Sequence, residues 1–143
     1  MGCYVATTVR ASQKEFAGKL GADRIIDFEA EQFESVLKDY DAVLDTVGGE
    51  VYKRSFHILK KDGIVVSMLQ NPPDQELMSK FGARSVALIT QVNRASLSRL
   101  SELVDTDVIR AQIDREFPLE KTREAYTYFE NDHLKGKVVI RVK

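Results

Sequence analysis

Short runs rich in valine, isoleucine and threonine alternate along this chain with segments whose apolar residues recur at helical spacing. The first run, Tyr4–Val9, has the β-branched alternation that favours a strand. Ser12 and Glu15 follow it at the spacing of a capping box, which predicts the start of a helix. Gly21 suits the end of that helix. The start of the chain is therefore expected to form a strand, a turn and a helix.

The same alternation continues to the end of the chain. Further strands are expected at Arg24–Phe28, Asp41–Val47, Ile64–Leu69, Val86–Thr90 and Lys137–Lys143. Helices are expected at about residues 29–38, 50–59, 75–81 and 120–131. Another is expected around Leu97–Val104, with Asn93 or Ser96 as its cap, and Val108–Ile113 is expected to be extended. Four aromatic residues fall on apolar helical faces and are expected in the core: Phe33, Phe56, Tyr126 and Phe129. Short apolar strands that alternate with helices predict an α/β fold with a parallel sheet covered on both faces.

The composition is that of an ordinary globular domain. The 143 residues are 43% hydrophobic and 30% charged, and 21 basic against 22 acidic residues leave a net charge of −1. This balance predicts no nucleic-acid partner, and the short apolar runs predict no membrane association. Cys3 is the single cysteine, so an internal disulfide and a cysteine-based zinc site are excluded. Such sparse cysteine is typical of a reducing, cytoplasmic environment.

Two cations and no acid mark the turn after the first expected strand. Arg10 lies just past that strand, and Lys14 lies in the first turn of the helix. Cations are disfavoured at a helix start unless an anion binds there. At this place in a dinucleotide-binding fold, a basic residue accommodates the 2′-phosphate of NADP, whereas an acid grips the 2′-hydroxyl of NAD. In such a fold the turn favours NADP(H); otherwise it is a solvated basic turn.

A series of motifs runs through the chain: ATTVRASQKEFAGKLGAD, RIIDF, YDAVLDTVGGE, LKKDGIVVSM, REFPLEKTREAYTYFE and HLKGKVVIRV. Each is weakly specific alone. In this order and spacing they resemble the C-terminal part of a medium-chain dehydrogenase/reductase of the zinc-independent quinone oxidoreductase branch, within the zinc-binding dehydrogenases. The resemblance covers essentially the whole chain. It implies a Rossmann-like, doubly wound parallel sheet and an NADPH-dependent reductase that passes hydride to a quinone or another conjugated carbonyl.

The resemblance also implies a set of cofactor-binding residues, which we extend by one: Thr8, Arg10, Lys14, Phe28, Thr46, Val47, Ser67, Met68 and Leu69. The first four surround the adenosine ribose and its phosphate. Arg10 has no fixed family counterpart and is added because a second cation suits a phosphate of charge about −2. Thr46 and Val47 match the adenosine side. The last three match the strand end near the nicotinamide, where the family often has glycine at the place of Leu69. No catalytic residue and no metal ligand is assigned.

The sequence departs from the family in one respect. The family's glycine-rich pyrophosphate loop precedes the strand at Tyr4, and no G-x-G-x-x-G occurs in this chain. We therefore expect a partial Rossmann-like sheet that lacks its first strand and glycine-rich loop, in a fragment that is inactive alone. Residues 1–92 would form the partial nucleotide-binding core. Residues 93–143 would form the C-terminal helices and closing strand of the same domain, and that strand normally joins a substrate domain absent here.

The missing strand is central in the order 3-2-1-4-5-6 of such sheets. Tyr4–Val9 and Asp41–Val47 are then expected either to pair directly or to leave a gap that another chain fills. Because open sheet edges invite pairing, we expect a homodimer or a strand-swapped assembly.

Few other residues carry a chemical signal. His57 and His133 are the only histidines, and both are expected to be structural. Asp45 ends a strand at the carboxyl edge, where ligands bind in such folds, and a structural or ribose-side role is expected for it rather than that of a base. A non-enzymatic partner or regulatory domain stays open as an alternative. A receiver-like domain phosphorylated at Asp45 is disfavoured because no acidic pair lies nearby in sequence to hold magnesium.

Overall fold

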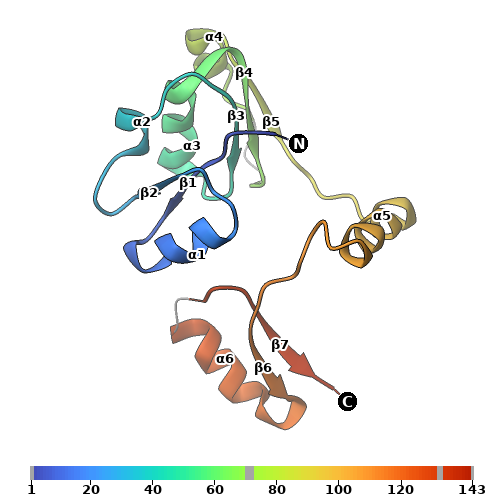
Figure 1. Cartoon of the computed structure of the whole chain (residues 1–143). Coiled ribbons are helices and arrows are strands. Elements are labelled where there is room, and N and C mark those ends of the chain that lie inside the picture. Colours follow the sequence, from blue (N-terminus) through green and yellow to red (C-terminus); the bar gives the residue numbers. More distant parts are fainter. Residues whose placement is uncertain (1, 70–72, 132–133, 143) are drawn as a thin grey trace. The chain divides into compact units, whose positions relative to one another are not determined.

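The computed structural model describes residues 2–69, 73–131 and 134–142, so His133 lies outside the described residues. The chain divides into two compact units, Met1–Gln91 and Val92–Lys143. In both units helices join the strands, and every strand pair among the described residues is parallel (Figure 1). The predicted α/β class with parallel strands is therefore confirmed.

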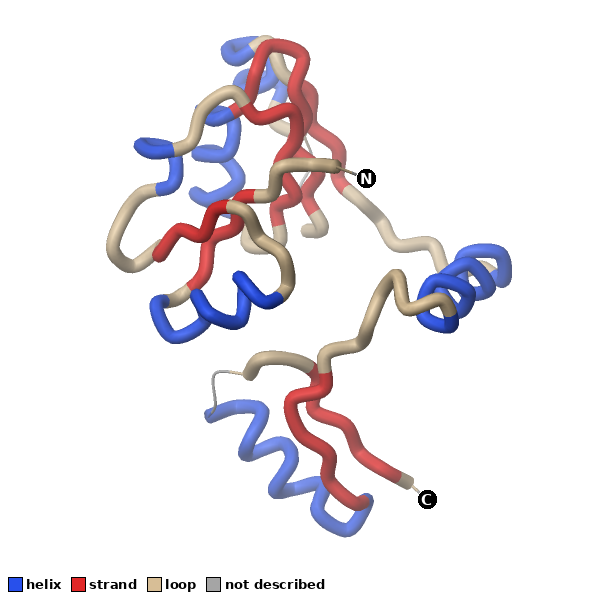
Figure 2. The backbone as a smooth tube through the Cα atoms, viewed as in Figure 1, coloured by secondary structure: helices blue, strands red, loops and turns tan. Residues whose placement is uncertain are grey.

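The first unit alternates strands and helices in the order that the sequence predicts. Its strands are β1 (Ala6–Val9), β2 (Arg24–Asp27), β3 (Tyr40–Asp45), β4 (Leu59–Ser67) and β5 (Arg84–Ala87). Its helices are η1 (Ala11–Gln13), α1 (Lys14–Lys19), α2 (Phe33–Val36), α3 (Gly49–Ser55), η2 (Phe56–Ile58) and α4 (Gln75–Phe81). Figure 2 shows the helical connections between successive strands. Such crossovers are what parallel pairing requires.

The strands of the first unit form two sheets instead of one. β1 pairs with β2, and β3, β4 and β5 form a second sheet in that order. β1 and β3 do not pair with each other within the described residues. The direct pairing that the sequence left open is thus not formed, and the strand order is the one expected when a strand is missing between β1 and β3.

Two apolar clusters hold the first unit together. The first joins Ile26 of β2, Phe33 of α2 and Ile58 of η2, with Ala6 and Val43 from the two sheets packed against it. It therefore bridges the two sheets. The second cluster lies around Phe56, which is 0% exposed. Its other buried members are Tyr52, Val65 and Ala83.

The first helix begins differently from the prediction. Ser12 lies inside η1 and caps nothing, and α1 starts at Lys14 with no side-chain cap. Glu15 instead pairs with Lys19 at 2.6 Å along the same helix. The predicted capping box is wrong because the chain enters the helix through a 3₁₀ turn, so Arg10 is the N-cap of that turn and Gln13 the N-cap of α1.

The second unit contains α5 (Arg94–Asp105), β6 (Ile113–Pro118), η3 (Leu119–Lys121), α6 (Thr122–Asn131) and β7 (Lys137–Arg141). β6 and β7 pair in parallel across α6. Asn93, one of the two predicted caps, does cap α5: its side chain accepts the Ser96 backbone N–H at 2.9 Å. Of the stretch Val108–Ile113, expected to be extended, only Ile113 lies in a strand, as the first residue of β6.

The core prediction is confirmed for Phe33 and Phe56 and is wrong for two residues of α6. Tyr126 and Phe129 are exposed, whereas Ala125 is buried. The face of α6 that meets β6 therefore runs through Ala125 and Tyr128, whose ring lies 5.8 Å from that of Phe117. Tyr126 and Phe129 lie on the neighbouring stripe of the helix. The spacing of apolar residues predicts the helix correctly but not the face of it that packs against β6.

Candidate functional site

Arg10 and Lys14 lie beside each other at the carboxyl end of the β1–β2 sheet. Arg10 directly follows β1 in an extended conformation, with φ −76° and ψ 155°, and Lys14 begins α1. Thr8 of β1 is exposed, and so is Phe28, which follows β2 and donates its backbone N–H to the Val9 carbonyl at 3.2 Å. The structure thus brings together the four residues that were predicted around the adenosine phosphate.

Acidic partners reach both cations from the end of β2. Arg10 Nε lies 3.3 Å from Glu29 Oε1, and Lys14 Nζ lies 3.3 Å from Asp27 Oδ2. Asp27 is buried, and its Oδ1 also accepts the Glu29 backbone N–H at 3.2 Å. The parallel register, which sets Val9 opposite Asp27, brings these acids to the turn. Sequence reasoning missed them because it counted only the acids between Thr7 and Lys14.

A second group of residues lies at the carboxyl ends of β3 and β4. Asp45 ends β3 and Ser67 ends β4, and the two residues are partners in the parallel register. The turn after β3 carries Thr46 and Val47, which are exposed. The turn after β4 carries Met68, which is exposed, and Leu69, which is partly exposed. These are the remaining residues that the sequence predicted, apart from Ser67 itself.

Asp45 and Ser67 lie beneath these turns. Asp45 is 3% and Ser67 1% exposed, so neither side chain is open to a ligand. Asp45 Oδ2 accepts the Ser67 hydroxyl at 2.8 Å, and Oδ1 accepts the backbone N–H groups of Val47 and Gly48 at 3.0 and 2.8 Å. A carboxylate enclosed in this way is not placed to receive a phosphoryl group or to act as a base.

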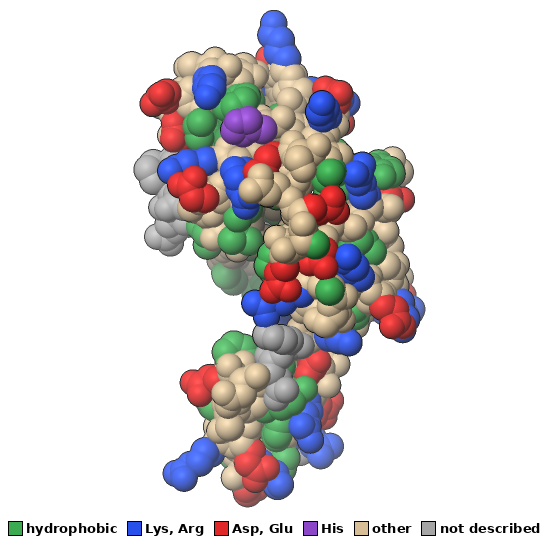
Figure 3. All heavy atoms as spheres, turned by 90° about the vertical axis from the view of Figure 1, so that its left-hand side faces the viewer, with side chains coloured by type: hydrophobic (Ala, Val, Ile, Leu, Met, Phe, Trp, Pro, Cys, Tyr) green, Lys and Arg blue, Asp and Glu red, His purple; other side chains and the backbone are tan. Residues whose placement is uncertain are grey.

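Charge elsewhere on the surface is mixed. On the face in Figure 3, basic and acidic side chains are interspersed without a large patch of one sign. At the start of α3, the hydrogen bond from Lys53 to Glu50, at 2.6 Å, lowers the pKa of Glu50 and raises that of Lys53. This exposed pair is worth little for stability and marks no site.

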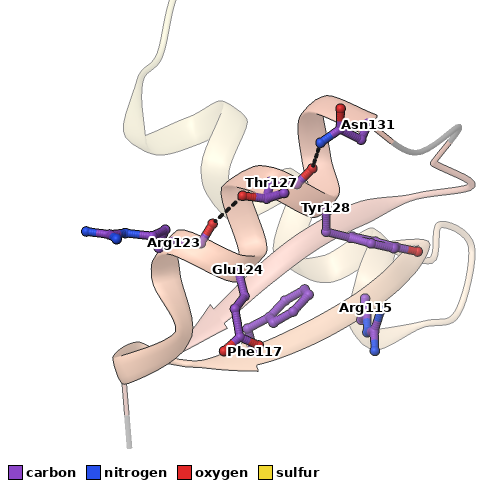
Figure 4. A pocket seen from close by; sticks show the side chains of 7 residues that line it. All are labelled: Arg115, Phe117, Arg123, Glu124, Thr127, Tyr128 and Asn131. Atoms are coloured by element: carbon purple, nitrogen blue, oxygen red, sulfur yellow. Dashed lines mark hydrogen bonds between the residues drawn. The ribbon is translucent and has the colours of Figure 1, made fainter.

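A cavity lies in the second unit, between β6 and α6. It has a volume of about 430 Å³, and Figure 4 shows its lining. The Arg115 guanidinium carbon lies 5.2 and 4.9 Å from the ring centroids of Phe117 and Tyr128. The Tyr128 hydroxyl donates to Asp114 at 2.6 Å and, with the Lys135 backbone N–H, lowers the pKa of that carboxyl group. These contacts stabilise the β6–α6 corner.

A fold of parallel strands joined by helices, with its candidate residues at the carboxyl ends of the strands, is Rossmann-like. Residues 20–140 match the family model described as zinc-binding dehydrogenase. The chain belongs to this family, and it corresponds to the C-terminal part of the medium-chain dehydrogenase/reductases of the quinone oxidoreductase branch.

Relatives and solved structures agree with this placement. The chain is 30% identical to the human NAD(P)H oxidoreductase RTN4IP1, mitochondrial, over 97% of this chain and 42% of that protein. It is 28% identical to the NADPH-dependent alkenal/one oxidoreductase, chloroplastic, of Arabidopsis thaliana, over 95% of this chain and 33% of that protein. The quinone oxidoreductase structure from Coxiella burnetii matches with a TM-score of 0.85 and 32% identity, covering 99% of this chain and 46% of that one.

The chain spans 42% or less of the length of these curated relatives. The names of those relatives place them in mitochondria and chloroplasts, so a cytoplasmic location stays a prediction for this chain. None of the described helices combines the length and the apolar character that crossing a bilayer would need.

The family name mentions zinc, but the described residues do not offer a zinc site. Zinc in proteins takes thiolate, imidazole and carboxylate ligands, three or four of them together. Within residues 2–69, 73–131 and 134–142, no group of three such side chains is close enough to hold a metal. Cys3, the single cysteine, is exposed. No step of a proposed reaction is therefore assigned to a metal in this part of the protein.

Proposed function

We propose that this chain is the nucleotide-binding part of an NADPH-dependent oxidoreductase that passes hydride to a quinone or another conjugated carbonyl compound. The carrying observation is the pair of cations, Arg10 and Lys14, at the carboxyl end of the β1–β2 sheet. Support comes from relatives named for NAD(P)H, for alkenal/one reduction and for quinone reduction. Bound NADPH supplies the hydride.

The described residues fit this cofactor in separate places. The 2′-phosphate would lie between Arg10 and Lys14, and the exposed ring of Phe28 would flank the adenosine. Thr46 and Val47 would line the adenosine side, and the turn after Ser67 would approach the nicotinamide. The substrate is a small molecule, held by parts of the protein outside the residues assigned here.

The carboxylates of Glu29 and Asp27 compete with the phosphate for Arg10 and Lys14. The Arg10–Glu29 pair is solvent-accessible, with side chains 40% and 57% exposed, and such ion pairs contribute about 0–1 kcal/mol, whereas the Lys14–Asp27 pair includes a buried carboxylate. A phosphate of charge about −2 attracts a cation more strongly than a single carboxylate does. The phosphate would therefore replace Glu29 as the partner of Arg10 at a small cost, and would approach Lys14 while Asp27 keeps its hydrogen bond from the Glu29 backbone N–H.

Lys14→Ala is expected to weaken NADPH binding roughly tenfold and to leave NADH binding within about twofold of wild type, because a charge-assisted hydrogen bond is worth about 1.5–3 kcal/mol. The measurement is titration of both cofactors, by calorimetry or nicotinamide fluorescence, into the protein as its gene encodes it. Equal losses for both cofactors would contradict the phosphate assignment.

Two further variants make this experiment sharper. Lys19→Ala removes a cation of the same helix that pairs with Glu15, so both affinities should stay unchanged. Glu29→Gln removes a carboxylate that competes for Arg10, so NADPH should bind more tightly while NADH does not. Absence of binding for both cofactors in the wild-type protein would favour a non-enzymatic partner or regulatory domain.

We propose in addition that the chain self-associates through β1. Beyond its pairing with β2, β1 has no strand partner among the described residues, and an open edge invites one. A groove of about 360 Å³ lies between one face of β1 and α1, lined in part by Val5, Thr7 and Val9. A second copy of the chain, adding a strand at this edge, would cover apolar side chains that are now exposed.

Sedimentation equilibrium of the 143-residue chain should show a reversible dimer or a strand-swapped assembly. Thr7→Lys, which introduces a charge into the groove, should shift the equilibrium to monomer. Thr127→Lys, the same change on exposed α6 of the other unit, should not. A monomer at all concentrations would rule out this association.

A further inference from the structure

Asp45 and Ser67 are polar residues buried at the carboxyl ends of β3 and β4. Apolar side chains of similar size would fill the same space without the cost of burying a carboxylate. The polar atoms of the pair are instead bonded to the turns that follow β3 and β4.

The hydrogen bonds form a continuous chain between these turns. The N–H groups of Val47 and Gly48 donate to Asp45, the Ser67 hydroxyl donates to Asp45, and the Leu69 N–H donates to the Ser67 oxygen at 3.2 Å. The Met68 N–H also donates to the Asp45 carbonyl, at 2.9 Å. The orientation of the Met68–Leu69 turn therefore depends on a hydroxyl group that is itself out of reach of any ligand.

The turn that this pair fixes presents apolar surface to solvent. Met68 is 49% exposed, and Leu69 is partly exposed. Apolar side chains held in a fixed arrangement at the carboxyl end of parallel strands suit the face of a planar ring. On the function proposed above, that ring is the nicotinamide.

We propose that Asp45 and Ser67 are positioning residues that hold the Met68–Leu69 turn for the nicotinamide half of the cofactor. The inference rests on the proposed function. Different residues then act on the two ends of the cofactor. Lys14 and Arg10 determine the affinity for the phosphorylated adenosine, and the buried pair determines how much the nicotinamide half adds to the affinity for NADPH.

The test compares NADPH with 2′,5′-ADP, which carries the phosphorylated adenosine but no nicotinamide. Both are titrated into the protein as its gene encodes it, well below its melting temperature. Ser67→Ala should weaken NADPH binding roughly tenfold, the effect of losing one net hydrogen bond, and leave 2′,5′-ADP binding within about twofold. Ser67→Thr, which keeps the hydroxyl group, should restore NADPH binding.

A matched control is available in the next strand. Ser85 is also buried, and its hydroxyl lies 2.8 Å from that of Tyr52. Ser85→Ala therefore removes a buried hydroxyl of the same kind away from the two turns, and both affinities should stay near wild type. Equal losses for NADPH and 2′,5′-ADP in Ser67→Ala, or a failure of Ser67→Thr to restore binding, would overturn the inference.

Amide hydrogen exchange tests the positioning without any cofactor. In Ser67→Ala the Leu69 amide should exchange faster, whereas amides within β1 and β2 should not change. Unchanged exchange at Leu69 would overturn the positioning role even if NADPH binds. Faster exchange at Leu69 in a protein that binds neither NADPH nor 2′,5′-ADP would contradict the proposed function, and the nicotinamide role with it. It would still show that the Ser67 hydroxyl holds the Leu69 amide.

Discussion

Phe56→Ala is expected to lower the free energy of unfolding by about 3–5 kcal/mol, the usual cost of deleting a buried aromatic ring. Phe56 is 0% exposed, and its ring lies 5.3 Å from that of Tyr52 and 6.1 Å from that of Phe81. The truncation leaves a cavity that two rings border, and rigid rings cannot close it. Since domains are stable by about 5–15 kcal/mol, this is a large share of the total. Urea denaturation measures it.

Phe28→Ala is the matched control for this substitution. Phe28 is 51% exposed, so the same change of side chain should cost well under the loss at Phe56, of order 1 kcal/mol. Its effect should appear in NADPH affinity instead. Equal destabilisation by the two variants would show that the core does not lie where the structure places it.

Gly136→Ala is expected to destabilise the second unit by about 3 kcal/mol. A Cβ atom at Gly136 would come within 2.8 Å of the Gln112 carbonyl carbon and 3.0 Å of the Asp114 nitrogen, and closer still to the Gln112 oxygen. These are backbone atoms at the start of the β6–β7 pairing and cannot swing aside as a side chain would. Amide hydrogen exchange in β6 and β7 should report the loss.

Gly18→Ala provides the contrast. A Cβ atom there would meet only the end of the Ile25 side chain, at 3.6 Å, which is ordinary contact. Alanine at this position in the last turn of α1 should therefore stabilise the chain slightly, by about 0.5–1 kcal/mol, because glycine is the poorer helix former. Loss of stability in Gly18→Ala, or none in Gly136→Ala, would contradict the packing described.

The fold class followed from the sequence because local signals agreed with the global arrangement. The β-branched runs at β1 and β4 indicate strands without knowledge of the rest of the chain. In the same way, the glycines after β3 indicate where that strand ends and a helix starts. What the sequence could not show was which stripe of α6 meets β6. Apolar residues occupy two neighbouring stripes, and only the position of Phe117 decides between Ala125 and Tyr126.

The candidate residues came mainly from the resemblance to the dehydrogenase/reductase family, and Lys14 also from the charge of its turn. The structure places Lys14, Phe28 and Met68 beyond the ends of parallel strands. The acids that face Arg10 and Lys14 could not be predicted, because they come from the end of β2 and depend on the register of β1 against β2. Nor could the sequence show that the Ser67 hydroxyl is enclosed, since this depends on where the Asp45 side chain turns.

The ion pairs of Arg10 with Glu29 and of Lys14 with Asp27 have a bearing on selectivity toward free anions. Inorganic phosphate or sulfate, which no other contact anchors, must compete with these carboxylates and gains little by doing so. On the proposed function, NADPH is also held by other contacts, so the cost of this competition is a smaller share of its binding free energy. The two ion pairs would then lower the affinity of Arg10 and Lys14 for free anions more than their affinity for the cofactor.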